Sequence, residues 1–568
     1  MLGRTQTGEI GVRWIGSSTE PDKRSIPESE LSAFIAEHEA AAAPRWVWSD
    51  TASWYPPLLA AGVRVERCHD LRLCHTILKL STFVRDHAAL AAATAWDAGA
   101  AAPLEAAGEP ALFDLVAADT PEREAPNTLA EAVTEFARQQ AALAESSAAG
   151  RLRFLLAAES AGALIAVEMK TAGLPWDTAE HDRILTESLG PRPAPGAKPA
   201  RMLTVAEEVR AALGDRFASV DSPPKLLRAL RDAGIAVDST SKWELAEHDH
   251  PAIEPLLRYK KLARLFTANG WAWLDEWVAD GRYRPVYVPG GVVTGRWASS
   301  GGGALQLPRQ LRSALRADPG WRLISADVAQ LEPRALAAMS GDRSMADAGR
   351  GTDLYAGIVA SGIVPTRDEA KIAVLGALYG ATTGDSGRLV PRLRRIFPAA
   401  MSLVDRAAAV GEHGGQVTTW LGRSSPPPTE GWRELQARAS LPGAGRPDEE
   451  RARRVAKEQG RFTRNFVVQG TAAEWALVWL AELRIRLWQL PVIDASGSAQ
   501  ASGPVFSDRA HLVFFLHDEV IVHAPTDLAK AAAAAVSEAA DAAGRLLFGD
   551  APVDFPLDLS IVERAVKH

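Results

Sequence analysis

The chain has 568 residues, of which 47% are hydrophobic and 23% are charged, and its net charge is −7. This length predicts several domain-sized units with substantial cores. No apolar run reaches the roughly 20 residues that cross a bilayer, and the first residues lack the apolar stretch of a secretory signal, so we expect a cytoplasmic protein. The acidic net charge argues against a protein that coats nucleic acid indiscriminately.

Mixed α/β structure is predicted for residues 1 to about 90. The runs 44–50 and 63–71 are strand-like, and the residues between them have a helical pattern. Cys68 and Cys74 fit neither a disulfide framework nor a standard zinc pattern, so we interpret them as ordinary structural residues.

Helices are predicted to dominate from about 88 to 280. Residues 88–150 are Ala-rich, residues 152–173 form one helical stretch, and the Pro-rich residues 190–200 indicate a linker or loop. Beyond 280, strand-like and helical segments alternate. Two stretches rich in turn formers, 424–450 and 494–508, are predicted to be surface loops.

Two acidic positions are placed where a metal ion could be held. An apolar strand ends at Asp327, and two β-rich runs flank His517-Asp518-Glu519, which predicts a hairpin with its acids at the tip. Two divalent ions about 3.5–4 Å apart can clamp the attacking and leaving oxygens of a phosphoryl transfer. Mg²⁺ prefers carboxylates, water and phosphates, so two aspartates would suffice. Taken alone, either motif is more often a surface turn or an ordinary strand end.

A third segment predicts a helix that could bind a triphosphate. Arg367, Lys371, Leu375 and Tyr379 are spaced by four residues, so on a helix they form one slowly drifting row. The two cations lie at the N-terminal end, where the helix dipole also favours negative charge. The alternative is a solvated basic face.

Basic patches that could follow a phosphate backbone occur in three places. Residues 294–317 contain Arg296, Arg309, Arg312 and Arg316 and no acidic residue, and further basic clusters lie at 388–395 and 451–457. Each patch alone could equally be a solvated surface.

Taken together, five blocks in the region 290–525 resemble DNA polymerase family A, the DNA polymerase I family. Asp327 to Arg334 resembles motif A (DYSQIELR), Arg367 to Gly380 resembles motif B (RxxxKxxxFGxxYG), and His517-Asp518-Glu519 matches motif C. Thr294-Gly295-Arg296 with Leu305-Gln306 resembles the TGRxSS…LQ segment. Residues 461–474 resemble the RxxxNxxxQGTAAD helix.

This resemblance implies an α/β (α+β) right-hand fold with palm, fingers and thumb. The implied domains are a 3′–5′ exonuclease-like domain of the ribonuclease H type (1–155), the thumb (156–290), the first part of the palm (291–345), the fingers (346–475) and the second part of the palm (476–568). The implied activity is template-directed addition of deoxynucleotides to a primer 3′ end in DNA repair or gap filling. The implied protein is a nucleoid-associated monomer that binds primer-template DNA, deoxynucleoside triphosphates and two Mg²⁺ ions, with Mn²⁺ as an alternative, and no membrane.

The resemblance also implies roles for individual residues. Asp327, Asp518 and the backbone carbonyl of Val328 would hold the metals, Glu519 would support that site, and Lys371 would donate a proton to pyrophosphate. Glu332 would act as the steric gate against a 2′-hydroxyl. The implied nucleotide contacts are Gln330, Leu331, Glu332, Tyr355, Arg367, Lys371, Leu375 and Tyr379, with Tyr379 at the template-base stacking position. The implied DNA contacts are Arg296, Gln306, Arg461, Asn465, Gln469 and His517.

Several positions depart from the family pattern. Leu375 replaces the aromatic residue expected against the deoxyribose, Tyr355 replaces a His near the phosphates, and Glu474 replaces the Asp of QGTAAD. The stretch between Gln306 and Arg309 is shorter than usual, so one phosphate-contacting Arg could be missing. None of these changes removes a predicted metal ligand.

The N-terminal region resembles an exonuclease domain that has lost its catalytic residues. Asp50 falls at the second acidic motif, but no DxE is found on a first strand, and Ser160 stands where a catalytic Asp is expected. We therefore expect no proofreading, and the alternative is exonuclease activity through other residues. Two further alternatives stay open for the whole chain. A single-subunit RNA polymerase is disfavoured by Glu332, and a catalytically silent primer-template-binding protein is disfavoured by the intact pair Asp327 and Asp518.

Overall fold

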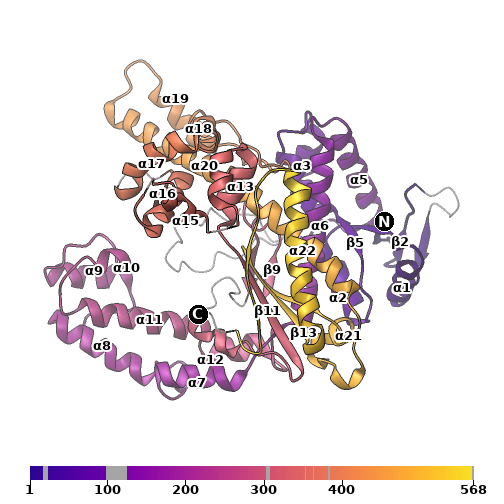
Figure 1. Cartoon of the computed structure of the whole chain (residues 1–568), viewed down its shortest axis with the longest axis horizontal. Helices are drawn as coiled ribbons and strands as arrows, with labels where there is room; N and C mark the ends of the chain where they lie inside the picture. The colour runs from indigo at the N-terminus through magenta and orange to yellow at the C-terminus, as the bar shows by residue number, and fades with distance from the viewer. Residues whose placement is uncertain are drawn as a thin grey trace.

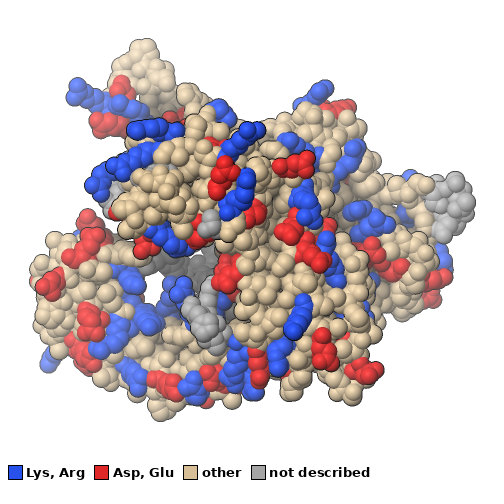
Figure 2. Space-filling model, viewed as in Figure 1, with Lys and Arg blue, Asp and Glu red and all other residues tan. Residues whose placement is uncertain are grey.

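The computed structural model describes residues 1–16, 23–97, 124–301, 303, 308–351, 353–362, 364–380 and 384–565. A central antiparallel sheet separates an N-terminal α/β unit from two groups of helices, which face each other across a gap (Figure 1). In the space-filling view this gap is a hollow, and Lys and Arg side chains gather at its rim (Figure 2). Among the described helices, none combines the length and the apolar character needed to cross a membrane.

The N-terminal unit is an α/β unit that contains a three-stranded sheet and a two-stranded sheet. Three antiparallel strands, in the order β1-β2-β3, are followed by the parallel pair β4-β5, and β1 packs beside β4. The strands are β1 (Leu2–Arg4), β2 (Ile10–Val12), β3 (Arg24–Ile26), β4 (Arg45–Trp48) and β5 (Arg67–Asp70). The helices around them are η1 (Glu28–Glu30), α1 (Leu31–Ala42), α2 (Thr51–Ala60), α3 (Leu71–Leu80), α4 (Ala88–Ala92), η2 (Thr94–Asp97) and α5 (Leu129–Ala144). The strands and the helix predicted between 44 and 71 are therefore confirmed.

Helix α6 (Ala149–Ala172) joins this unit to the rest of the chain. It packs against α2, α3 and β5 on one side and against the long helix α20 (Arg446–Gln489) on the other. At this junction the buried Glu168 accepts hydrogen bonds from Arg484 (2.9 Å) and from the Tyr55 hydroxyl (2.7 Å). Because breaking a buried ion pair leaves an uncompensated charge, this contact ties the N-terminal unit firmly to α20.

The helical group at the lower left of Figure 1 runs from α7 to α12 and includes small strands. The helices are α7 (Thr178–Leu189), α8 (Ala200–Leu213), α9 (Pro223–Asp232), α10 (Lys242–Leu245), α11 (Ile253–Asn269) and α12 (Trp271–Trp277). The strands β6 (Leu174–Pro175), β8 (Arg282–Tyr283) and β7 (Val278–Ala279) form a small sheet at its base. Asp177 caps α7 by accepting a 3.0 Å hydrogen bond from the backbone of Glu180, which sets where this group of helices begins.

The central sheet has the strand order β12-β13-β11-β14, and its pairs are all antiparallel. The strands are β11 (Trp321–Val328), β12 (His511–Leu516), β13 (Glu519–Pro525) and β14 (Leu557–Val562). Helices α20 and α22 (Ala529–Phe548) cover one face, and the Ala-rich face of α22 lets it lie close to Trp475 and Trp479. Beside the sheet lie the pair β9 (Val286–Val288) and β10 (Ala298–Gly301) and the turn η4 (Arg309–Ala314).

The helical group at the upper left follows β11 directly. Its helices are α13 (Leu331–Ser340), α14 (Arg343–Gly349), α15 (Leu354–Ala360), α16 (Arg367–Tyr379), α17 (Gly384–Ile396), α18 (Pro398–Glu412) and α19 (Glu430–Ala439). The N-terminal half of α20 packs along α18 and completes the group. The helix predicted at 367–380 is confirmed as α16.

Some sequence expectations differ from the structure. The stretch 424–450 is not a plain loop, because it contains α19 and the first turn of α20. The stretch 494–508 contains the short helices η5 (Ala495–Gly497), η6 (Gln500–Ser502) and α21 (Gly503–Phe506). A sequence rich in Gly, Pro and Ser favours turns, but it does not prevent a helix between two turns. The domain boundaries expected after 155, 345 and 475 fall inside α6, α14 and α20.

Candidate active site

The end of β11 and the hairpin β12–β13 bring Asp327 and Asp518 together. Within the sheet, Asp327 lies opposite Glu519 on β13 and opposite Asp558 on β14. His517 and Asp518 form the turn between β12 and β13, and His517 has a left-handed backbone conformation (φ 56°) that a tight turn requires. The backbone N–H of Val328 donates a 2.9 Å hydrogen bond to the carbonyl of Asp518. The predicted hairpin is confirmed.

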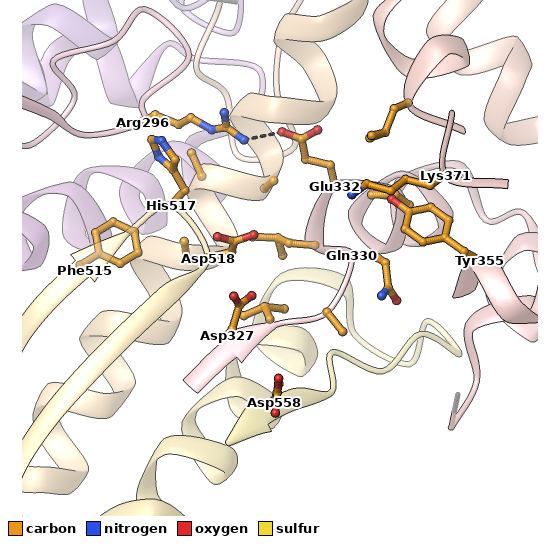
Figure 3. Close-up of a pocket in the computed structure, with 18 of the residues that line it drawn as sticks. Arg296, Asp327, Gln330, Glu332, Tyr355, Lys371, Phe515, His517, Asp518 and Asp558 are labelled. Atoms are coloured by element: carbon orange, nitrogen blue, oxygen red, sulfur yellow. Dashed lines mark hydrogen bonds and ion pairs between the residues drawn. The ribbon is translucent and has the colours of Figure 1, made fainter. Parts of the chain in front are cut away.

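A cavity of about 780 Å³ opens at this end of the sheet (Figure 3). It is lined by most of the residues that the sequence singled out. These are Arg296, Asp327, Val328, Gln330, Leu331, Glu332, Tyr355, Arg367, Lys371, Leu375, Tyr379, His517 and Asp518. Asp327 and Asp518 come from the end of β11 and the β12–β13 turn, and Arg367 and Lys371 come from α16, so carboxylates and cations from distant segments line one cavity.

Of the predicted residues that the structure describes, four do not line this cavity. Asn465 and Gln469 are buried within α20, and Arg461 on the same helix is exposed. Both Glu519 oxygens accept 2.6 Å hydrogen bonds from Arg312, so Glu519 is part of a buried ion pair. It begins β13 rather than lying at the hairpin tip. Gln306 lies outside the described residues.

The negative charge of Asp327 acts on the neighbouring Asp518. Burial, and next the negative charge of Asp327, raise the pKa of Asp518 to about 6. Burial, and next the positive charge of Arg296, lower the pKa of His517 to about 4. A carboxylate whose ionisation is opposed by a neighbouring negative charge is stabilised by a nearby cation. The donors here are oxygens, which suits a hard divalent ion.

The number of protein ligands is small. Within the described ranges, no group of three or more His, Cys, Asp or Glu side chains is placed to hold a metal ion. A site made of Asp327, Asp518 and the Val328 carbonyl would therefore leave the remaining positions to water and phosphate oxygens, as Mg²⁺ sites at phosphates commonly do.

Glu332, in the first turn of α13, joins two other cavity residues. Its carboxylate forms an ion pair with Arg296 (Figure 3) and accepts a 2.6 Å hydrogen bond from the Tyr379 hydroxyl. Burial and the charge of Glu332 raise the pKa of Tyr379. Because both partners hold it, Glu332 presents a fixed bulky side chain between the sheet and α16.

The turn that carries Arg296 has a buried support. Gly295 has a φ of 90°, and a Cβ at this position would lie 2.5 Å from Arg423 Nε. Arg423 in turn donates a 2.6 Å hydrogen bond to the buried Glu159 on α6. Only glycine fits this close approach. The turn Thr294-Gly295-Arg296 therefore needs glycine both for its positive φ and for the contact with Arg423.

Residues that the sequence did not single out also line the cavity. Asp353 precedes α15, Asp558 lies on β14, and Trp297 and Phe515 form an apolar wall. The alternation in Leu557-Asp-Leu-Ser-Ile-Val predicts a strand, but only the register with β11 places Asp558 next to Asp327. Asp353 lies two residues before Tyr355. Its position just before a helix is the feature of the sequence that could have identified it as a cap residue near the site.

Of the two positions expected to carry exonuclease carboxylates, one is an aspartate, Asp50, and the other is Ser160. Asp50 caps α2 and pairs with Arg72 at 3.2 Å. Ser160 is fully buried, and its hydroxyl donates to the Leu156 carbonyl (2.8 Å) and accepts from the backbone of Asp70 (3.1 Å). Strand β1 (Leu2–Arg4) carries no acidic residue.

Comparisons with known proteins agree with this geometry. The sequence profile of DNA polymerase family A matches residues 207–561. DNA polymerase I of Chloroflexus aurantiacus is 28% identical over 335 residues, which cover 54% of this chain and 32% of that protein. Thermostable DNA polymerase I of Thermus filiformis is 26% identical over 343 residues, covering 55% of this chain and 36% of that protein. The matches thus span about a third of the length of these curated relatives.

Among solved structures, the POL domain of Pol1 from M. smegmatis in complex with DNA primer-template and dNTP superposes with a TM-score of 0.66. The superposition covers 98% of this chain and 92% of that chain at 16% identity. This likeness shows the fold, a right-hand polymerase domain with palm, fingers and thumb.

Proposed function

The chain belongs to DNA polymerase family A, and on that premise we propose that it is a template-directed DNA polymerase that acts as a monomer in repair or gap filling. It would add deoxynucleotides to a primer 3′ end by phosphoryl transfer. The observation that carries the proposal is the cavity that Asp327 and Asp518 line together with Arg367 and Lys371. A site of this kind offers oxygen ligands for cations, and cations for a triphosphate.

Asp327, Asp518 and the carbonyl of Val328 would hold two Mg²⁺ ions, with Mn²⁺ as an alternative. The raised pKa of Asp518 supports this assignment, because a divalent cation would relieve the repulsion from Asp327. Bound metal would lower the pKa of the primer 3′-hydroxyl and would neutralise negative charge on the phosphates. Glu519 would contribute indirectly, since its ion pair with Arg312 fixes the start of β13 next to Asp518.

Arg367 and Lys371 would bind the incoming triphosphate at the N-terminal end of α16. Thr366 caps this helix by accepting a 3.2 Å hydrogen bond from the backbone of Glu369, and the helix dipole adds favourable potential for an anion. Lys371 would donate the proton to the departing pyrophosphate. Gln330, Leu331 and Tyr355 would complete the nucleotide site.

Glu332 would lie beneath the sugar and exclude a 2′-hydroxyl, because Arg296 and Tyr379 leave it little freedom to move. Leu375 would pack against the deoxyribose and Tyr379 near the template base. Arg296, His517, Gln306, Arg461, Asn465 and Gln469 would contact primer-template DNA. For Asn465 and Gln469, which are buried here, DNA contact would require a shift of side chains along α20.

We assign residues 1–155 to an exonuclease-like domain without activity, 156–290 to the thumb, 291–345 and 476–568 to the palm, and 346–475 to the fingers. The buried hydroxyl of Ser160 and the pairing of Asp50 with Arg72 support the loss of the nuclease, because neither residue presents a carboxylate to a shared metal.

One assay with purified protein and a labelled primer-template tests the proposal. With Mg²⁺ and all four deoxynucleotides, the primer should lengthen to the end of the template. Without nucleotides, it should stay intact. Tight primer-template binding without any extension would instead identify a catalytically silent binding protein and refute the proposed activity.

A further inference from the structure

Arg367 forms an ion pair within the cavity, with a carboxylate from a neighbouring helix. Its Nη2 donates a 2.8 Å hydrogen bond to Oδ2 of Asp353, which directly precedes α15. The ring of Tyr355 packs against the guanidinium, with the Arg367 Cζ 5.5 Å from the ring centroid. Arg367 is therefore held on two sides while its side chain remains about half exposed (53%).

The carboxylate of Asp353 has a fixed position. Its Oδ1 accepts a 2.8 Å hydrogen bond from the backbone of Ala356 and caps α15, and its Oδ2 accepts a 2.9 Å hydrogen bond from Gln330 Nε2. Gln330 is itself constrained, because its backbone is left-handed (φ 52°) and its side-chain carbonyl accepts 3.3 Å bonds from Leu354 and Arg334. Burial opposes ionisation, but the hydrogen bonds from Arg367 and from the backbone keep the pKa of Asp353 below its usual value.

The same Arg367 guanidinium is the group that would bind a triphosphate. A carboxylate and a phosphate present similar acceptor oxygens to a guanidinium, so they compete for its donors. A triphosphate next to an ionised Asp353 would also be repelled by it. Arg367 and Lys371 are one helical turn apart, about 6 Å along the axis, and both face the cavity with Asp353.

We propose that Asp353 occupies Arg367 in the nucleotide-free site and must release it to the incoming triphosphate. This inference rests on the proposed function. The carboxylate acts as an internal competitor, which weakens binding of a polyphosphate. Gln330 and Arg367 both donate hydrogen bonds to Asp353 Oδ2. When Arg367 is released, Gln330 remains as a side-chain donor to this carboxylate.

The test is a direct measurement of polyphosphate binding to the full chain without DNA. Asp353→Asn removes the competing charge but retains an amide oxygen that can cap α15. The matched control is Asp368→Asn, which removes the same charge from the exposed residue next to Arg367. Titration calorimetry with dATP and, separately, with inorganic tripolyphosphate, at one fixed Mg²⁺ concentration, gives the dissociation constants.

For Asp353→Asn we expect Kd for both ligands to fall about three- to tenfold. Loss of an exposed ion pair contributes up to about 1 kcal/mol, a factor of about five in Kd, and relief of the repulsion between Asp353 and the phosphates adds to it. Asp368→Asn should stay within about twofold of the unsubstituted protein. Tightening for dATP alone would assign the effect to nucleoside contacts and overturn the competition. Unchanged or weaker binding in Asp353→Asn would also overturn it, because Asp353 would then be a partner that positions Arg367 for the ligand.

A second variant guards against a folding effect. Asp353→Ser can still cap α15, yet its shorter side chain cannot reach Arg367, so it should tighten binding like Asp353→Asn at an unchanged melting temperature. If the unsubstituted protein bound no triphosphate at all, the inference would fail. A protein that extends no primers but shows the predicted change in Kd would refute the proposed function and leave this inference standing.

Discussion

The backbone N–H of Val328 donates a 2.9 Å hydrogen bond to the backbone carbonyl of Asp518. This bond links the end of β11 to the turn of the β12–β13 hairpin through main-chain atoms alone. The relative position of the two aspartates therefore does not depend on their side chains. Neutral substitutions at Asp327 or Asp518 should consequently remove charge without moving the site, which makes them clean tests of the chemistry.

Glu332 provides a test of sugar selectivity. Replacement by Ala opens space beneath the sugar, so we expect selectivity for dATP over ATP to fall by at least about tenfold, in line with the 1–3 kcal/mol that small steric differences contribute. Glu332→Gln keeps the bulk and removes the charge, so its selectivity should stay near that of the unsubstituted protein. Single-nucleotide incorporation rates measure both. Equal losses in the two variants would show that the ion pair with Arg296, rather than bulk, controls the choice of sugar.

Lys371 provides a test of proton donation. In Lys371→Ala we expect kcat to fall about 10²-fold or more, because a positioned general acid contributes at least that much, and KM for the nucleotide to rise. Lys371→Arg keeps the positive charge but cannot readily give up its proton. It should recover KM while kcat stays low. Recovery of kcat in Lys371→Arg would assign Lys371 to binding alone.

Glu474 predicts a pH dependence of stability that is separate from catalysis. This glutamate on α20 is buried against Thr419 and the backbone N–H of Leu421, and burial raises its pKa from 4.5 to about 7. The folded state thus holds a proton that the unfolded state releases at lower pH. The free energy of unfolding should fall as pH rises from 4.5 to about 7. The full loss, on the order of 3 kcal/mol, should persist above that range.

Glu474→Gln removes this titration. The variant should melt a few degrees above the unsubstituted protein at about pH 8, and the difference should vanish toward pH 4.5. Glu458→Gln, an exposed change on the same helix, should show no such pH dependence. A constant difference across the whole pH range would mean that Glu474 stays ionised in the folded protein.

The N-terminal unit should not degrade DNA. With Mg²⁺ and a labelled single strand, we expect no shortening from the 3′ end, because Ser160 and the acid-free strand β1 lack carboxylates at positions where a two-metal site would need them. Digestion that persists in Asp518→Asn would reveal a nuclease centre independent of the polymerase site.

Much of the site was predictable because its signals are local. The β-rich runs on either side of His517-Asp518 predict a hairpin, and the four-residue spacing from Arg367 to Tyr379 predicts one helical face. The remainder depends on contacts between distant segments. The pairing of Arg312 with Glu519, the register that brings Asp558 beside Asp327, and the burial of Asn465 and Gln469 within α20 leave no periodic trace in the sequence.

The fold shows the same division. Strands β4 and β5 and helix α2 follow from apolar runs and turn residues, and all three were predicted. Helix α19 was missed, because the Pro- and Gly-rich residues around it favour turns more strongly than its ten residues favour a helix. The length of α20 was also not apparent, since a 44-residue helix is stabilised by its packing on α18 and α22 rather than by local propensity.

The most direct test of the central claim is the rate of primer extension by Asp518→Asn, measured together with the Kd for primer-template DNA. If Asp327 and Asp518 jointly hold the metals, extension should fall by about 10³-fold or more while the Kd changes by no more than about threefold. Asp527→Asn, an exposed aspartate just beyond β13, should extend at the unsubstituted rate. Near-normal extension by Asp518→Asn would contradict the assigned site.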